Sequence, residues 1–204
     1  MSLLNKLHTQ AHAKAVFGRR VAVLAKTIAD YIPQGARVLD IGCGSGTLAK
    51  AIMNIRPDVS IEGIDVLVRP GTDIPVTAFD GRTIPWGDDH FDVALFVDVL
   101  HHTLAPDALM AEAKRVARQG IVIKDHLREG LFADATLRFM DWVGNASHGV
   151  VLPYNYLSDS EWQAIWSRLD LKVQRMQDKV GLYPAPFSWF FDRRLHFVAR
   201  LAAD

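Results

Sequence analysis

Short apolar runs alternate with longer amphipathic segments over the first two thirds of the chain. The segments at residues 47–55 and 106–118 carry apolar residues at helical spacing, so they are predicted as helices. Because strands that alternate with helices form right-handed βαβ units, this pattern predicts a parallel sheet. Five apolar runs are predicted as its strands: residues 37–41, 59–65, 75–79, 91–97 and 121–124.

The pattern changes on both sides of this region. Residues 1–32 are predicted as helix, and Pro33 ends it. Past Asp125, a helix is predicted over residues 131–143 and a loop over 144–156. The strict strand and helix rhythm therefore ends at about residue 126.

The C-terminal segment begins with a helix signal. Ser158 and Glu161 have the spacing of a capping box, which predicts a helix that runs to about Arg168. Its two tryptophans, four positions apart, are expected in the core. Two last strands are predicted at 171–179 and 195–201, and the prolines between them predict a loop rather than a helix.

The composition is that of an ordinary globular protein, with 204 residues, 50% hydrophobic and 23% charged. Lys and Arg number 23 and Asp and Glu number 23, so no chain-wide basic field exists for nucleic acid. The Arg19–Arg20 and Arg193–Arg194 pairs are expected to be solvated. A single cysteine, Cys43, excludes an internal disulfide framework and a cysteine-rich zinc site.

Targeting signals are not evident in the sequence. No apolar run reaches the length of a membrane span, and the first twenty residues lack the apolar core of a signal peptide. The cytoplasm is therefore the expected location, and the sequence leaves the oligomeric state open.

A glycine loop, residues 40–46, stands where the first strand turns into a helix. Its glycines permit positive φ angles, and the helix N-terminus adds unsatisfied N–H groups, which favours a nucleotide-like ligand. A dinucleotide fingerprint fails because Thr47 stands where its third glycine belongs, and a Walker loop is absent. Asp65 follows about twenty residues later, at the end of the second strand, where a carboxylate can accept ribose hydroxyls.

The sequence VLDIGCGSG around this loop resembles motif I of class I S-adenosylmethionine-dependent methyltransferases. The resemblance continues in order over about residues 35–126. It includes Glu62–Asp65, the FDG and IPW stretches at 79–86, the strand and VLHH exit at 91–102, and the helix end at 114–120. One departure is Gln119–Gly120, where the family often has two glycines.

The resemblance implies S-adenosyl-L-methionine as cofactor, with S-adenosyl-L-homocysteine as product. The glycine backbone would pass near the methionine part, Asp65 would hold the ribose, and Asp80 would accept from the adenine amino group. Cys43 is interpreted as a packing residue rather than a nucleophile. The implied cofactor-binding set is Asp40, Gly42, Cys43, Gly44, Gly46, Asp65, Val66, Asp80, Gly81 and Val97.

The fold that this resemblance implies is an α/β, Rossmann-like, doubly wound sheet of seven strands. The sheet is mostly parallel with an antiparallel last strand, and helices cover both faces. We expect a single methyltransferase domain over residues 1–204. Its parts are an N-terminal helical cap (1–34), a cofactor-binding core (35–126), an inserted acceptor lid (127–157) and a C-terminal helix with a strand pair (158–204).

Three histidines are the candidate catalytic residues. His101 and His102 leave the fourth strand at the ligand edge, and His126 follows the fifth strand at that edge. Each has three possible roles: general base, hydrogen-bond donor to the acceptor, or structural loop residue. Their spacing matches no standard metal motif, so no metal is predicted.

The expected reaction is methyl transfer by in-line displacement to a small-molecule acceptor. Aromatic and apolar residues at 131–157 favour a partly apolar acceptor. A NAD(P)-dependent oxidoreductase and a non-catalytic cofactor-binding regulatory module remain as alternatives. A nucleic-acid methyltransferase is disfavoured by the zero net charge and by Val-Asp-Val-Leu after the fourth strand.

Overall fold

The computed structural model describes residues 17–145 and 154–203. A helix over residues 17–29 precedes a single sheet. Its strands are β1 (Arg37–Ile41), β2 (Ser60–Asp65), β3 (Val76–Ala78), β4 (Val93–Val97), β5 (Ile121–His126), β6 (Leu171–Gln177) and β7 (His196–Ala203). The helices are α2 (Thr47–Ile55), the 3-10 turn η1 (Leu100–His102), α3 (Pro106–Val116), α4 (Ala133–Asn145), α5 (Asp159–Arg168) and α6 (Ser188–Phe191).

The strand order is β3-β2-β1-β4-β5-β7-β6. The first five strands in this order run parallel, and β7 is antiparallel to both of its neighbours. The order reverses between β1 and β4, and ligands of such sheets bind at the carboxyl edge of this switch point. The predicted fold class is confirmed.

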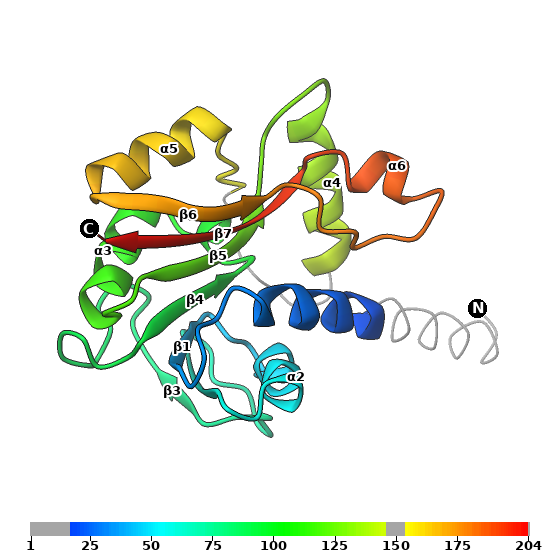
Figure 1. The fold of residues 1–204 in the computed structure, drawn as a ribbon. Helices are drawn as coiled ribbons and strands as arrows, with labels where there is room; N and C mark the ends of the chain where they lie inside the picture. Colours follow the sequence, from blue (N-terminus) through cyan, green and yellow to red (C-terminus); the bar gives the residue numbers. More distant parts are fainter. Residues whose placement is uncertain (1–16, 146–153, 204) are drawn as a thin grey trace.

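Helices lie on both faces of the sheet (Figure 1). Because successive strand residues point to opposite faces, one apolar layer forms on each side. Leu39 and Ile41 of β1 face the core that α3 and α5 cover, whereas Val38 faces the other. That second core is covered by the helix at 17–29 and by α2. The capping box at Ser158 and Glu161 is present and begins α5, and both of its tryptophans are buried.

Several predicted boundaries are wrong. The fifth strand reaches His126 instead of ending at residue 124, because β7 pairs with it over six residues and extends it. Phe91 makes only an isolated bridge to Ala117, so β4 begins later, at Val93. The predicted loop between the last strands contains the short helix α6. This helix starts after Pro186, so no proline lies in its interior.

The predicted lid is partly described. In Figure 1, α4 stands beyond the carboxyl ends of β4 and β5. Its Leu137 is buried in a small apolar cluster with Tyr156 and Leu195. Residues 1–16 of the predicted cap and 146–153 of the predicted loop lie outside the described residues. In the described ranges, every helix is too short or too polar to cross a membrane.

Candidate functional site

The glycine loop turns sharply from β1 into α2. Gly42, Gly44 and Gly46 have φ angles of 75°, 58° and 77°, which L side chains rarely adopt. At Gly46, a Cβ would lie 2.4 Å from the side chain of Ile74, and at Gly42 it would lie 2.6 Å from that of Val99. The loop thus needs glycine for its backbone conformation and for its close packing.

A cleft of about 610 Å³ opens beside this loop. Its volume is within the ordinary range for small-molecule sites. Of the predicted site residues it brings together Gly42, Asp65, Val66, Asp80, Gly81 and His102. The remaining lining residues are Phe79, Arg82, Val99, Thr103, Leu104, Ala105, Ala108 and Leu109.

Asp65, at the end of β2, is tied to the glycine loop. The Gly44 N–H donates to its Oδ2 at 2.8 Å, and the Leu67 N–H donates to its Oδ1 at 2.9 Å. Each carboxylate oxygen can accept a second hydrogen bond. The side chain is therefore held at the cleft wall with acceptor capacity left for a ligand diol.

Asp80 lies in the turn after β3. Its Oδ1 accepts from the Thr83 N–H at 2.7 Å and from the Arg82 N–H at 2.8 Å. These two backbone donors lower the pKa of the Asp80 carboxyl, so it is ionised at neutral pH. Gly81, at a φ of 78°, completes the turn.

Other predicted cofactor residues do not line this cleft. Asp40 is buried at the end of β1, where burial and then the charge of Asp65 raise its pKa to about 7. Burial, followed by the charges of Asp40 and Asp65, raises the pKa of the Cys43 thiol to about 12, so it is not a thiolate. Val97 packs at the edge of the second core. Gly44 and Gly46 are also absent from the lining.

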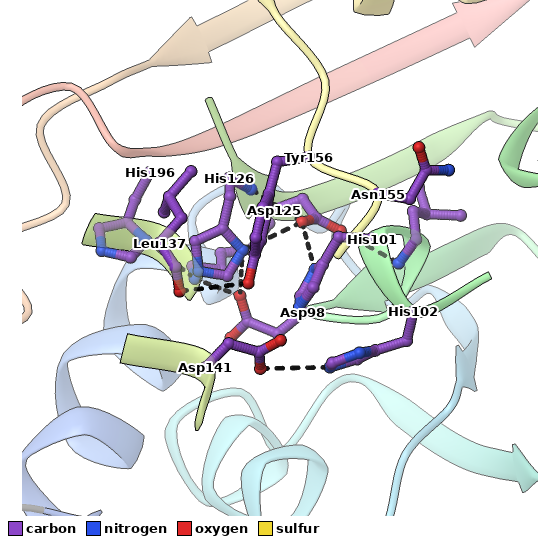
Figure 2. A network of polar contacts seen from close by, with 12 residues as sticks. Asp98, His101, His102, Asp125, His126, Leu137, Asp141, Asn155, Tyr156 and His196 are labelled. Atoms are coloured by element: carbon purple, nitrogen blue, oxygen red, sulfur yellow. Dashed lines mark hydrogen bonds and ion pairs between the residues drawn. The ribbon is translucent and has the colours of Figure 1, made fainter. Parts of the chain in front are cut away.

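The candidate histidines gather at the carboxyl ends of β4 and β5 (Figure 2). His101 is buried, with its Nδ1 2.7 Å from Oδ1 of Asp125 and its ring stacked on Tyr156. The Nδ1 of His126 lies 3.2 Å from the same Asp125 oxygen. Of the three, only His102 lines the cleft.

Charge neighbours set the protonation of these groups. Burial lowers the pKa of His101, but the charge and hydrogen bond of Asp125 outweigh it, so the pKa is raised. Burial and the charge of Lys124 lower the pKa of His126 to about 4. His102 also has a lowered pKa, through burial and the charge of His101. His102 and His126 are thus neutral imidazoles at pH 7.

A partly buried ion network that the sequence did not predict adjoins the histidines. Asp98, at a φ of 58° after β4, pairs with Arg20 at 2.5 Å and with Lys124. Burial opposes ionisation of Asp98, but these two cations hold its pKa well below the usual value. Arg20 keeps 38% of its side-chain surface exposed, but the sequence did not predict its pairing with Asp98. The sequence carried one signal for this network, because Lys124 stands among the apolar residues of β5.

Two further members of the cluster had no sequence signal. Asp141 of α4 has its Oδ1 3.8 Å from Nε2 of His102. His196 of β7 has its Nδ1 3.4 Å from Nζ of Lys124. Both come from elements far along the chain, so only the fold brings them to this edge.

A family model described as a methyltransferase domain matches residues 10–175, more than half of the chain. The chain belongs to the methyltransferase-domain family. The resemblance to class I S-adenosylmethionine-dependent methyltransferases is confirmed, and with it the prediction of an enzyme of this class. The family implies S-adenosylmethionine as cofactor, and the glycine loop, Asp65 and the cleft fit that group.

Curated relatives agree with this family. A ubiquinone/menaquinone biosynthesis C-methyltransferase, UbiE, from Cupriavidus necator is 28% identical over 145 residues. That match covers 62% of this chain and 60% of the relative. The corresponding protein of Cupriavidus metallidurans is 28% identical over 168 residues, or 72% of this chain and 68% of its own.

Solved structures with low identity share the fold. An S-adenosylmethionine-dependent methyltransferase from Mesorhizobium loti has a TM-score of 0.64 at 15% identity, covering 88% of this chain and 97% of that one. The [4+2]-cyclase SpnF has a TM-score of 0.62 at 14% identity, covering 89% and 80%. A shared fold therefore does not by itself decide the reaction.

Proposed function

We propose that this protein transfers the methyl group of S-adenosylmethionine to a small, partly apolar acceptor. The observation that carries the proposal is the single cleft that joins the glycine loop and Asp65 to His102. The bound cofactor supplies an electrophilic methyl group on a sulfonium. In-line displacement then depends mostly on how the protein aligns the acceptor and excludes water.

The cofactor end of the cleft is assigned to the acids and glycines. Asp65 accepts hydrogen bonds from the ribose hydroxyls, and Asp80 accepts from the adenine amino group against Val66 and Gly81. The backbone at Gly42, Gly44 and Gly46 runs beside the methionine part. Asp40, Cys43 and Val97 support this loop from the buried side.

The acceptor end is assigned to the segment after β4. Leu104, Ala105, Ala108 and Leu109 give it an apolar wall, which supports a partly apolar acceptor. His102 is the histidine that contacts the acceptor. His101 and His126 lie behind it and act as positioning residues. The names of the curated relatives place them in ubiquinone/menaquinone biosynthesis, which also supports a small-molecule acceptor.

Ligand-dependent melting tests the cofactor assignment. At about 100 times its Kd, S-adenosylhomocysteine stabilises the fold by roughly 2.7 kcal/mol, which raises Tm by about 5–10 °C. NAD should leave Tm unchanged. Asp65→Ala should remove most of the shift because the ribose loses its acceptor, whereas Asp134→Ala, on the exposed face of α4, should keep it.

Three results would contradict the proposal in different ways. A Tm shift with NAD instead of S-adenosylhomocysteine indicates the oxidoreductase alternative. A full shift in Asp65→Ala removes the ribose assignment. Cofactor binding without methyl transfer across a broad panel of small acceptors indicates the regulatory alternative.

A further inference from the structure

A cluster of possible metal ligands stands at the acceptor end of the cleft, outside the residues assigned to the cofactor. His101, His102 and Asp141 each offer one ligand atom, and these atoms lie within 4.8 Å of one another. They come from η1 and from α4, which meet beyond the carboxyl ends of β4 and β5 (Figure 2). The set consists of two imidazoles and one carboxylate, a common ligand combination for first-row transition metals.

Three carboxylates surround these histidines, those of Asp98, Asp125 and Asp141. Arg20 and Lys124 pair with Asp98. Asp125 and Asp141 each lie within ion-pair distance of a histidine, so imidazole nitrogens and carboxylate oxygens, both of which bind metal ions, stand side by side here.

Asp125 gives the cluster the arrangement seen behind metal-bound histidines. Such a histidine usually donates its second ring N–H to a carboxylate, which fixes its tautomer and orientation. The Nδ1 of His101 lies 2.7 Å from Asp125, which leaves its Nε2 for another partner.

We propose that His101, His102 and Asp141 bind one divalent first-row transition-metal ion, with Asp125 orienting His101. In a tetrahedral site with bonds of 2.0–2.2 Å, ligand atoms lie about 3.4 Å apart. The separation of 3.8 Å between His102 Nε2 and Asp141 Oδ1 is close to this value. The other ligand separations lie within 4.8 Å, so side-chain movements that shorten them form the site.

A second trio, His101, Asp125 and His126, is also within ligand distance but is a poorer site. All three residues are buried, and none of them lines the cleft. The ammonium of Lys124 repels a cation there, as it already disfavours the charged form of His126. His102, in contrast, lines the cleft and leaves the proposed ion open toward it.

Because His102 lines the same cleft as the apolar acceptor wall, an ion bound to it would be reached from that cleft. A polar atom of the acceptor can bind there, which orients it toward the cofactor. This consequence rests on the proposed function, whereas metal binding itself does not.

Titration of the tag-free protein with Co²⁺ tests the site, because bound Co²⁺ absorbs in the visible range when its coordination number is low. We expect one saturable Co²⁺ site per chain in the absorbance titration. Calorimetry with Zn²⁺ should give the same stoichiometry. Asp141→Asn and His102→Gln should each weaken binding by about tenfold or more, and Asp125→Asn by about 10–100-fold. His90→Ala, which precedes β4 at the opposite edge of the sheet, is the matched control and should bind normally.

The absence of saturable binding overturns the proposal. Equal binding by wild type and both ligand variants also overturns it, since it places the ion on other histidines. Melting curves show whether each ligand variant folds. If one variant does not fold, the other still tests the site. S-adenosylhomocysteine binding is measured separately, so failure of the metal site leaves the proposed function standing.

Discussion

Asp40 shows a conflict between stability and binding at a single residue. The carboxyl is buried at the end of β1, and burial and Asp65 raise its pKa to about 7. In the unfolded chain an aspartate titrates near 3.9. Because the folded protein binds this proton more tightly, Asp40 stabilises the fold only at low pH, and its contribution falls as pH rises from about 4 to 7.

Asp40→Asn should therefore stabilise the ligand-free protein at alkaline pH. Three pKa units correspond to at most about 4 kcal/mol at pH 8, and relaxation around the site reduces this ceiling. Melting curves of wild type and variant between pH 5 and pH 8 should diverge as pH increases. The same variant should bind S-adenosylhomocysteine more weakly at pH 8, because the glycine loop loses the carboxylate assigned to its support.

The pH dependence of the Tm difference tests the raised pKa of Asp40. If the Tm difference stays constant over this pH range, the Asp40 carboxyl does not titrate there, and its raised pKa is contradicted. Asp107→Asn, at an exposed position in the first turn of α3, serves as the control and should change Tm little at any pH.

At the scale of elements, β7 decides how the sheet ends. It inserts antiparallel between β5 and β6 and pairs with β5 from Ile121 to His126. This pairing carries Asp125 and His126 into regular strand geometry and places His196 opposite His126. The histidine cluster therefore depends on a strand that starts seventy residues after His126.

Gly120 controls the entry into this strand pair. It has a φ of 106°, and a Cβ there would lie 2.0 Å from the carbonyl oxygen of Leu201. The Cα of Ala202 would lie 2.8 Å away. Because both obstacles are backbone atoms, the strain cannot relax by a rotamer change. Gly120→Ala should cost more than about 3 kcal/mol and lower Tm by roughly 6–12 °C.

Gly87→Ala is the matched control, since nothing lies within 4 Å of a Cβ at that position. It should change the free energy of unfolding by less than about 1 kcal/mol. A Gly120→Ala variant as stable as this control would show that β7 does not approach Gly120 as closely as the structure has it.

At the scale of the whole molecule, local patterns predict the frame and long-range contacts complete the site. The strands, their parallel order and the positions of Asp65 and Asp80 follow from apolar runs and turn residues, because each signal lies within a few positions. The contact of Arg20 with Asp98 joins residues 78 positions apart. No local periodicity encodes it, just as none places Asp141 beside His102. Sequence therefore predicts the cofactor end better than the acceptor end.

Hydrogen exchange tests this division over the entire chain. Bound S-adenosylhomocysteine should slow exchange in three peptides that are distant in sequence but meet at the cleft: residues 40–48, 64–68 and 79–84. These segments contain the glycine loop, Asp65 and Asp80, and ligand contact there raises the free-energy cost of local opening. The fast-exchanging amides of β6 and α6 should keep their rates, because neither element borders the cleft.

Protection that appears in α6 but not in these three peptides would place the cofactor elsewhere. Protection in only one of the three would show that the cleft does not act as a single site.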